Sequence, residues 1–246
     1  CSAISGGGTF RANLFNGRLM TNTANFDGGG AYAGSLVDCL ASGNSAGVAG
    51  GGAAYISEGL RCRLIGNSAN QGGGLHAGVL KHSFVTGNRA AYGAGISQSS
   101  AINCTVVDNR ASSEGGGAYG GPEAVVQDSI FYYNSAPVGP DFSGMMPQNC
   151  IASIESFGVI ATNIPGLACL SNPRLLPGSI AVDADPNPTD PPCDIDGDFR
   201  PGGDAEDIGA DEFVSDSLVG PLSIQLKPSV THSIAGIPIR FDVEIE

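Results

Sequence analysis

Two markers recur at a nearly constant interval along the chain as far as position 136. The first is a cluster of glycines, which reads Gly-Gly-Gly in every unit except one Gly-Ala-Gly. The clusters begin at Gly6, Gly28, Gly50, Gly72, Gly93 and Gly115, so the interval is 22 in every case except one, where it is 21. Such a fixed period limits the chain to a repeat architecture in which each unit stacks on the next.

The second marker is an asparagine that is followed two residues later by alanine. It occurs in register with the glycines, at Asn22, Asn44, Asn67, Asn88, Asn109 and Asn134. Asparagine is a turn residue that tolerates left-handed backbone, and identical asparagines can hydrogen-bond along a stack. We therefore expect these six residues to have a structural role.

The residues before each asparagine alternate between apolar and polar, which indicates a short strand. Val37, Cys39 and Ala41 share one parity. The other parity places polar residues where we expect them to face water, at Asp38, Arg61, His82, Asn103 and Asp128. Because so short a strand cannot bury one face alone, stacked units must supply a shared interior.

These patterns predict an all-β protein, a right-handed parallel β-helix built as a solenoid of coils of about 22 residues each. A leucine-rich repeat has a similar period but needs a dense leucine pattern, which is absent. With only 14% charged residues, we expect almost no helix. We predict regular coils over 1–136, irregular last coils with an acidic C-terminal cap over 137–213, and a linker with a β tail over 214–246.

The tail alternates apolar and polar residues over 222–226 and 237–243. Two alternatives stay open: the first strands of an immunoglobulin-like module, or an edge strand that packs back along the β-helix. Because the chain starts at Cys1 and ends at Glu246 inside a strand-like run, we expect it to be part of a longer protein. Cys1 itself could be the lipid-bearing first residue of a lipoprotein.

The net charge argues against a nucleic-acid partner, and the hydropathy argues against a transmembrane segment. The chain has 11 basic and 24 acidic residues, a net charge of −13, so a phosphate backbone would be repelled and we expect no nucleic-acid partner. No run of about 18 apolar residues exists, so we expect no transmembrane segment.

The repeat units resemble the polymorphic outer membrane protein repeat, which has a Gly-Gly-Ala-Ile element and a Phe-x-x-Asn element. The resemblance lies in Gly-Gly-Gly-Ala-Tyr at 28–32 and Ile-Asn-Cys-Thr-Val-Val-Asp-Asn-Arg-Ala at 102–111. The Phe-x-x-Asn element is matched in full only at 131–134, Phe-Tyr-Tyr-Asn. The resemblance implies a right-handed β-helix on a bacterial surface.

The acidic segment resembles the closing part of choice-of-anchor Q proteins, which are secreted bacterial β-helix proteins with varied anchoring signals. The matching residues are Asp-Ile-Asp-Gly-Asp-Phe-Arg-Pro at 194–201 and Asp-Ile-Gly-Ala-Asp-Glu-Phe at 207–213, and 172–185 also fits. Together the two resemblances extend over positions 6–213. They imply an extracellular or cell-surface location and no fixed enzymatic activity.

Three of the seven cysteines, Cys39, Cys62 and Cys104, occupy one repeat position, which serine fills in other units. We expect a column of small inward residues. The alternative is a disulfide, since Cys39 and Cys62 on adjacent coils would lie within bridging range; a Cys150–Cys169 bridge is a second possibility, and the sequence leaves the pairing open. No Cys-x-x-Cys spacing supports a zinc site.

Asp38, Arg61 and His82 are the candidates for catalysis, because neighbouring coils would bring a carboxylate, a cation and an imidazole together. Such a set could abstract a proton beside a sugar acid, as in a polysaccharide lyase or hydrolase. The alternative is an ordinary solvated face. The nearly constant coil length provides no long loops to wall a substrate cleft, which favours a non-catalytic protein.

A second column is aromatic and follows the glycine clusters, at Phe10, Tyr32, Tyr55, His76 and Tyr119. A stripe of this kind can stack against sugar rings and is our candidate ligand-binding surface. The alternative is that these rings fill space at a corner.

Residues 183–212 contain 11 of the 24 acidic residues, with Arg200 as their only base. The alternation of Asp194, Asp196 and Asp198 is typical of a Ca²⁺ loop, although the Glu that should complete the loop is replaced by Ala205. We expect these side chains to cap turns and expect no cofactor, with a Ca²⁺ site at Asp194, Asp196 and Asp198 as the alternative.

The function that we expect is non-catalytic: a secreted or surface-displayed bacterial solenoid for adhesion, structural display or glycan contact. Its partners would be glycans or surface proteins. A polysaccharide lyase or glycoside hydrolase is one alternative. Another is a filament subunit that associates end to end through its open sheet edges.

Overall fold

The computed structural model describes residues 2–48, 50–56, 58–186, 193–214, 225–228 and 241–244. The chain divides into two units, Cys1–Phe213 and Val214–Glu246. In the second unit β30 (Gln225–Pro228) pairs antiparallel with β31 (Phe241–Glu244). The other residues of the predicted tail strands, like Cys1, lie outside the described part.

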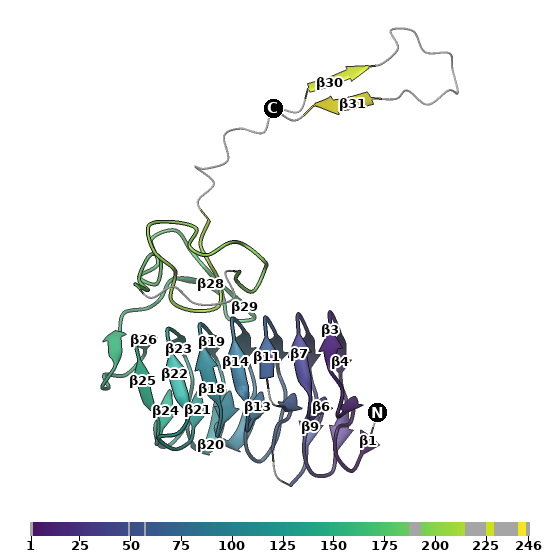
Figure 1. Ribbon diagram of the computed structural model, residues 1–246. Helices are drawn as coiled ribbons and strands as arrows, with labels where there is room; N and C mark the ends of the chain where they lie inside the picture. The colour runs from purple at the N-terminus through teal and green to yellow at the C-terminus, as the bar shows by residue number, and fades with distance from the viewer. Residues whose placement is uncertain are drawn as a thin grey trace. The chain divides into compact units, whose positions relative to one another are not determined.

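The first unit is a parallel β-solenoid, as predicted (Figure 1). Its strands pair in parallel from coil to coil, for example Thr9 with Ala31 of the next coil. The described residues contain no helix. They accordingly include no helix long and apolar enough to cross a membrane.

Three sheets form the long sides of the solenoid. The first sheet contains β2 (Thr9–Phe10), β6 (Ala31–Tyr32), β10 (Ala54–Tyr55), β13 (Leu75–His76), β17 (Ile96–Ser97), β21 (Ala118–Tyr119) and β24 (Phe142–Ser143). The second contains β3 (Leu14–Phe15), β7 (Ser35–Val37), β11 (Glu58–Leu60), β14 (Val79–Lys81), β18 (Ser100–Ile102), β22 (Val125–Gln127) and β25 (Met146–Gln148). The third contains β4 (Arg18–Met20), β8 (Leu40–Ser42), β12 (Arg63–Ile65), β15 (Phe84–Thr86), β19 (Thr105–Val107), β23 (Ile130–Tyr132), β26 (Cys150–Ala152) and β27 (Val159–Ala161).

Shorter ladders complete each coil. One contains β1 (Ser2–Ala3), β5 (Thr23–Ala24) and β9 (Ser45–Ala46), and another pairs β16 (Arg89–Tyr92) with β20 (Arg110–Glu114). We call this part of the coils the fourth side. Beyond the coils, β28 (Leu167–Cys169) and β29 (Asn172–Leu175) form an antiparallel hairpin.

The glycine clusters lie at the corner that precedes the first sheet. The leading glycine is left-handed, with φ of 64° at Gly28, and a Cβ there would lie 2.1 Å from the carbonyl oxygen of Ala31. In the third coil this residue is Gly51 (φ 74°), one position later than the sequence period suggests. A seventh coil follows from Gly139 (φ 56°), so regular stacking continues beyond position 136.

The six repeated asparagines form a continuous buried ladder. In the middle of it, Asn67 donates from its backbone N and its Nδ2 to Oδ1 of Asn88, at 2.8 and 3.0 Å. Asn88 does the same to Asn109, at 3.0 and 2.9 Å. The left-handed residue of this turn is the one before the asparagine, such as Gly66 or Gly87. The asparagine therefore acts through its side chain and not through an unusual backbone.

The corner between the second and third sheets corrects the predicted strand. It is a column of left-handed residues: Asn16, Asp38, Arg61, His82, Asn103, Asp128 and Asn149, with φ between 45° and 54°. Each corner splits the expected single strand in two, so the parity changes across it. Leu36, Cys39 and Ala41 are buried in the interior, whereas Val37 is half-buried.

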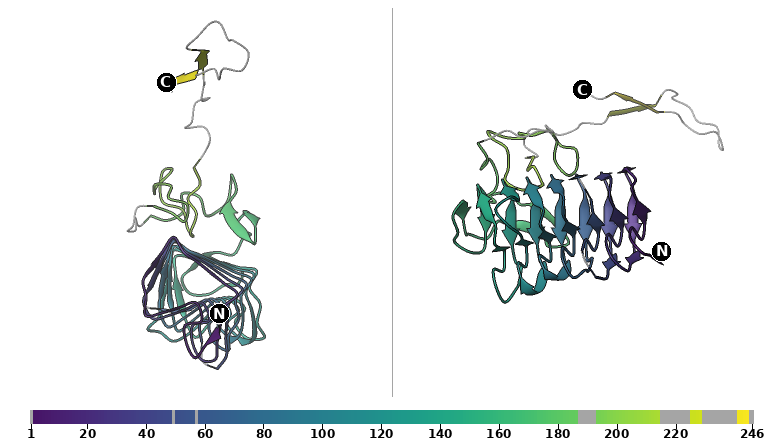
Figure 2. Two further views of the ribbon diagram at one scale, coloured as in Figure 1. Left: turned by 90° about the vertical axis from the view of Figure 1, so that its right-hand side faces the viewer. Right: turned by 60° about the horizontal axis from the view of Figure 1, so that its bottom comes forward.

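The acidic segment packs along the outer face of the third sheet, and we call residues 164–186 and 193–213 the lateral segment. The backbone N of Ala210 donates to Oγ1 of Thr105 at 3.1 Å. The backbone N of Gly209 donates to the carbonyl oxygen of Asp128 at 3.0 Å. Figure 2 shows this segment beside the coils when they are viewed along the stack.

The outer face of the third sheet explains this packing. Phe84, Thr105, Ile130 and Ile151 are in register on that face, and each is at most 1% exposed. Two apolar clusters lie over them. Phe84 packs with Ile195 and Ala210; Ile130 and Ile151 pack with Leu175, Ala181 and Ile208. This part of the third sheet is therefore buried on both faces, so the lateral segment belongs to the core of the first unit.

Candidate functional site

Asp38, Arg61 and His82 do lie in adjacent coils, in the left-handed corner column. Their surroundings differ sharply along the stack. Asp38 and Arg61 are half-buried, whereas His82 has no exposed surface. The prediction that this polar column faces water is wrong for His82, Asn103 and Asp128, which are all 0% exposed, because the lateral segment covers them.

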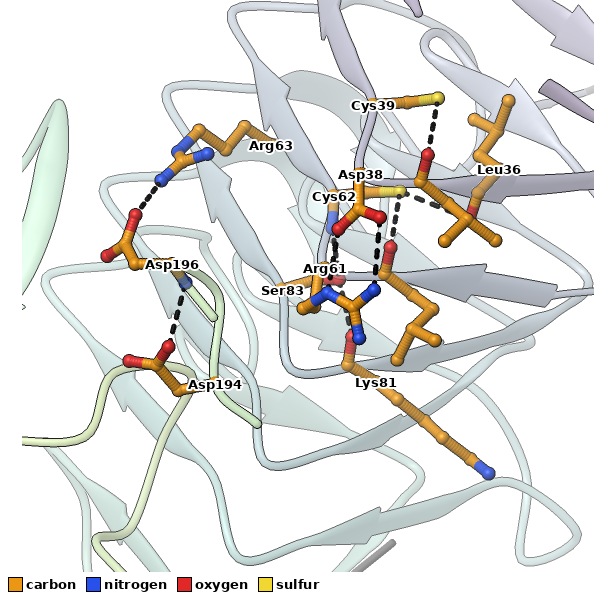
Figure 3. A network of polar contacts seen from close by, with 12 residues as sticks. Leu36, Asp38, Cys39, Arg61, Cys62, Arg63, Lys81, Ser83, Asp194 and Asp196 are labelled. Carbon is orange, nitrogen blue, oxygen red and sulfur yellow. Dashed lines mark hydrogen bonds and ion pairs between the residues drawn. The ribbon is translucent and has the colours of Figure 1, made fainter. Parts of the chain in front are cut away.

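Asp38 and Arg61 form a two-point ion pair (Figure 3). The Nε of Arg61 lies 2.7 Å from Oδ1 of Asp38, and Nη2 lies 3.0 Å from Oδ2. This hydrogen-bonded pairing raises the pKa of Arg61. Both oxygens of the carboxylate therefore already accept a guanidinium proton, which leaves the pair poorly suited to stabilise a substrate charge.

His82 is enclosed between the corner and the lateral segment. Its Nδ1 lies 3.3 Å from Nη1 of Arg200, which also donates to the carbonyl oxygen of Gly209 at 3.0 Å. Burial, followed by the positive charges of Arg200, Arg61 and Lys81, lowers the pKa of His82 to about 3. The imidazole is therefore neutral at physiological pH, but no substrate can reach it past the lateral segment.

An open hollow of about 370 Å³ lies beside Asp38, lined by Arg18, Leu40 and Arg63 among others. His82 does not line it. The carboxylate and the imidazole of the candidate catalytic set thus face different environments, and the structure does not bring all three groups to one accessible place.

Arg200 is the centre of a buried charge network that sequence reasoning missed. Its Nε lies 3.2 Å from Oε2 of Glu212 and 3.7 Å from Oε2 of Glu206, and all three side chains are at most 3% exposed. Its Nη2 also donates to the carbonyl oxygen of Asp207. One feature of the sequence could have revealed this network: Arg200 is the only basic residue among the acidic residues of 183–212.

The carboxylates of this segment mostly cap backbone N–H groups. Asp194 accepts from the backbone N of Asp196 and Asp198, at 2.8 and 2.9 Å, and from that of Glu212 at 2.9 Å. Asp207 accepts from the N of Asp183 at 2.7 Å and of Phe213 at 2.6 Å. This is the turn-capping role that the sequence favours for these side chains over a Ca²⁺ site.

The candidate Ca²⁺ ligands are only partly gathered. Oxygens of Asp194, Asp196 and Asp211 lie within 4.8 Å of one another, and Asp198 is not in this group. Asp196 is already paired with Arg63 at 2.6 Å and with Arg174 (Figure 3 shows the Arg63 pair). Arg174 also lies 3.4 Å from Asp211. Two guanidinium groups thus supply the positive charge that a cation would bring.

The aromatic column follows the outer face of the first sheet. Phe10 and Tyr32 stack with ring centroids 5.3 Å apart and planes 10° apart, and Tyr32 and Tyr55 with 5.2 Å and 26°. Tyr55 and His76 follow at 5.3 Å with a tilt of 54°. Because the rings stack on one another, they present mainly their edges outward.

Ser97 interrupts this column, and Tyr119 continues it beyond. Tyr119 packs against Tyr92, the last residue of β16 on the fourth side, with centroids 5.3 Å apart. We call the rings of Phe10, Tyr32, Tyr55 and His76 the aromatic ridge. Phe10 is 53% exposed at its end, and the other three are half-buried, so the ridge partly fills the corner and partly faces solvent.

The cysteine column is interior, as expected. Cys39, Cys62, Cys104 and the serines between them are buried, and Cys150 of the seventh coil continues the same position. Within the described part of the chain all six cysteines are free thiols. Neither pairing that the sequence left open, Cys39 with Cys62 or Cys150 with Cys169, is formed. Cys150 is buried inside the coils, whereas Cys169 is exposed.

Comparison of this chain with models of protein families, with curated proteins and with solved structures finds no match.

Proposed function

We propose that this chain is a non-catalytic β-solenoid module that is secreted or displayed on a bacterial surface, where it serves adhesion, structural display or glycan contact. The observation that carries the proposal is the burial of His82 beneath the lateral segment. A general base must lie within hydrogen-bond reach of the proton that it removes. Asp38 and Arg61, the other two groups of the candidate catalytic set, are paired with each other and are therefore not free to act on a substrate.

The proposed location follows from the resemblance of the repeats to the polymorphic outer membrane protein repeat and of residues 194–213 to choice-of-anchor Q proteins. The acidic, charge-poor surface is compatible with an exported solenoid. Whether the chain belongs to either family is part of the proposal.

Glycan contact is proposed for the aromatic ridge. It presents ring edges of Phe10, Tyr32 and Tyr55 in a row along the stack. Aromatic rings offer apolar contact, and tyrosine hydroxyls offer hydrogen bonds, which together suit the mixed surface of a sugar chain. A linear glycan could follow the ridge across several coils.

A panel of neutral and acidic polysaccharides tests this function, read for binding, for release of unsaturated uronates by ultraviolet absorbance and for new reducing ends, which a hydrolase would produce. We expect binding without product release. Replacing both Tyr32 and Tyr55 with alanine should weaken neutral-glycan binding at least tenfold. Phe157→Ala is the matched control, because Phe157 is 82% exposed and lies outside the ridge.

Turnover of any polysaccharide that is lost in His82→Ala or Arg61→Ala would overturn the proposal and favour the polysaccharide lyase or hydrolase. Binding that survives the double tyrosine replacement would remove the ridge as the contact surface.

Self-association is a second candidate, favoured by the first coil. Its strands β2, β3 and β4 are at the end of their sheets, so each has an edge without a strand partner in the described structure. Phe15 and Met20 of this coil are 64% and 52% exposed. Open edges with apolar side chains favour pairing with another chain, and a sedimentation coefficient that rises with concentration would support it.

A further inference from the structure

Two arginines lie side by side on the outer face of the fourth side. Arg89 of β16 and Arg110 of β20 are in register on adjacent coils. Both are exposed. The equivalent residue is small and uncharged in the other coils: Thr23, Ser45, Ser68 and Ser135. The change to arginine is therefore confined to two neighbouring coils.

This pair differs from most other cations of the first unit. Five of those cations lie within 4.0 Å of a carboxylate: Arg61, Arg63, Lys81, Arg174 and Arg200. Arg89 and Arg110 form no ion pair with any residue that the structure describes. Like charges directly opposite on adjacent strands repel, and an anion bound between the two guanidinium groups would relieve this repulsion.

The nearest acidic residues along these strands do not neutralise the two arginines. Asp108 lies two positions before Arg110 and, within the described structure, makes no ion pair with it. Glu114, at the end of β20, accepts a hydrogen bond from Oγ of Ser143 at 2.9 Å. The arginine pair thus remains a local positive patch on a chain with a net charge of −13.

A hollow of about 590 Å³ adjoins the pair, a size typical of sites for small ligands. It spans three coils. Its lining comprises Arg89, Arg110, Ser112, Ser135, Ala90, Ala111, Ala136 and Pro137.

We propose that this hollow binds the acidic group of an anionic saccharide between Arg89 and Arg110. Guanidinium groups match carboxylate and sulfate oxygens with two parallel hydrogen bonds. The hydroxyls of Ser112 and Ser135 are available to sugar hydroxyls, and Ala136 and Pro137, which are partly exposed and exposed, offer apolar contact to the ring. The inference rests on the proposed glycan contact, for which it names an acidic ligand class and a second surface.

The test uses the full chain and three probes of similar length: an oligogalacturonate, a chondroitin sulfate oligosaccharide and a neutral cello-oligosaccharide. Arg89→Ser and Arg110→Ser restore the residue type that other coils carry at this position, so the fold should tolerate them. Arg18→Ser, at an exposed arginine of β4, is the charge-matched control for each single variant.

We expect calorimetry at low salt to show binding of at least one acidic probe. Each single serine variant should weaken it about fivefold and the double variant at least twentyfold, while Arg18→Ser leaves it unchanged. Binding of the oligogalacturonate identifies a carboxylate ligand and binding of the chondroitin sulfate alone a sulfate ligand.

The inference is overturned if neither acidic probe binds at millimolar concentration, or if the double serine variant binds like the parent chain. Acidic-probe binding that depends on Tyr32 and Tyr55 instead would overturn this site and leave the proposed function standing. Turnover that depends on His82 would overturn the proposed function, and the serine variants would still decide where the acidic probe binds.

Discussion

Replacing Asn88 with alanine is expected to lower the free energy of unfolding by about 3–5 kcal/mol, since it leaves several buried polar groups without a partner. Oδ1 of Asn88 accepts from the backbone N and Nδ2 of Asn67. Its Nδ2 donates to the carbonyl oxygen of Leu64 and to Oδ1 of Asn109, both at 2.9 Å. Water cannot replace these bonds, because Asn88 is 0% exposed.

Asn70→Ala is the matched control, because Asn70 lies in a neighbouring coil and is exposed. Its replacement should change stability by less than about 0.5 kcal/mol, as surface substitutions usually do. Urea unfolding of both variants measures the difference. Equal midpoints for Asn88→Ala and the parent chain would show that the ladder does not stabilise the stack.

Replacing Arg200 with alanine is expected to weaken the packing of the lateral segment by about 3–5 kcal/mol, the usual effect of removing one partner from a buried ion pair. Glu212 and Glu206 would lose the buried guanidinium that lies beside them. Two hydrogen bonds to backbone carbonyls, of Asp207 and Gly209, would be lost as well. Residues 193–213 should then become sensitive to proteases while the coils stay resistant.

This loss should be larger at pH 8 than at pH 5. Burial raises the pKa of Glu212, and it raises that of Asp207 to about 7; the charge of Arg200 opposes both shifts. A carboxyl whose pKa is higher in the folded state stabilises the fold at low pH, and this contribution disappears as pH rises through the folded-state value. Without Arg200 the pKa values of Glu212 and Asp207 rise further, so ionisation of these two carboxyls at pH 8 destabilises the folded state more.

Arg18→Ala, at an exposed arginine, is the control for the loss of one positive charge. A protease pattern for Arg200→Ala that matches the parent chain at pH 8 would contradict the role of Arg200. Arg200→Lys keeps the charge and loses the forked donor geometry, so it should recover only part of the stability.

The sequence period predicts the solenoid because each coil repeats the same local demands. The leading glycine must be left-handed, as at Gly28, and the asparagine must reach its counterpart one coil away, as Asn67 reaches Asn88. The alternation of apolar and polar residues does not reveal the corner at Asp38. A single left-handed residue there reverses which alternate positions face the interior, without changing the residue types beside it.

The covering of the third sheet depends on contacts between distant parts of the chain. Ile208 packs on Ile130 and Ile151, and Ala210 on Phe84. The sequence does carry a signal, because Ile130-Phe131 and Cys150-Ile151 are apolar at both parities, as expected for a sheet buried on both faces. The sequence does not show which distant segment covers that face, and for this reason His82 is predicted to face solvent.

The NMR titration of His82 tests the central claim most directly, with His82→Gln to assign its imidazole signals. Enclosed by the lateral segment, His82 should stay neutral from pH 8 to about pH 4.5, since its pKa is lowered to about 3. The unfolded chain would bind a proton near pH 6.5, so this residue disfavours the folded state as pH falls below that value. A midpoint near pH 6.5 in the folded chain would contradict the account, because His82 would then be open to solvent and available as a base.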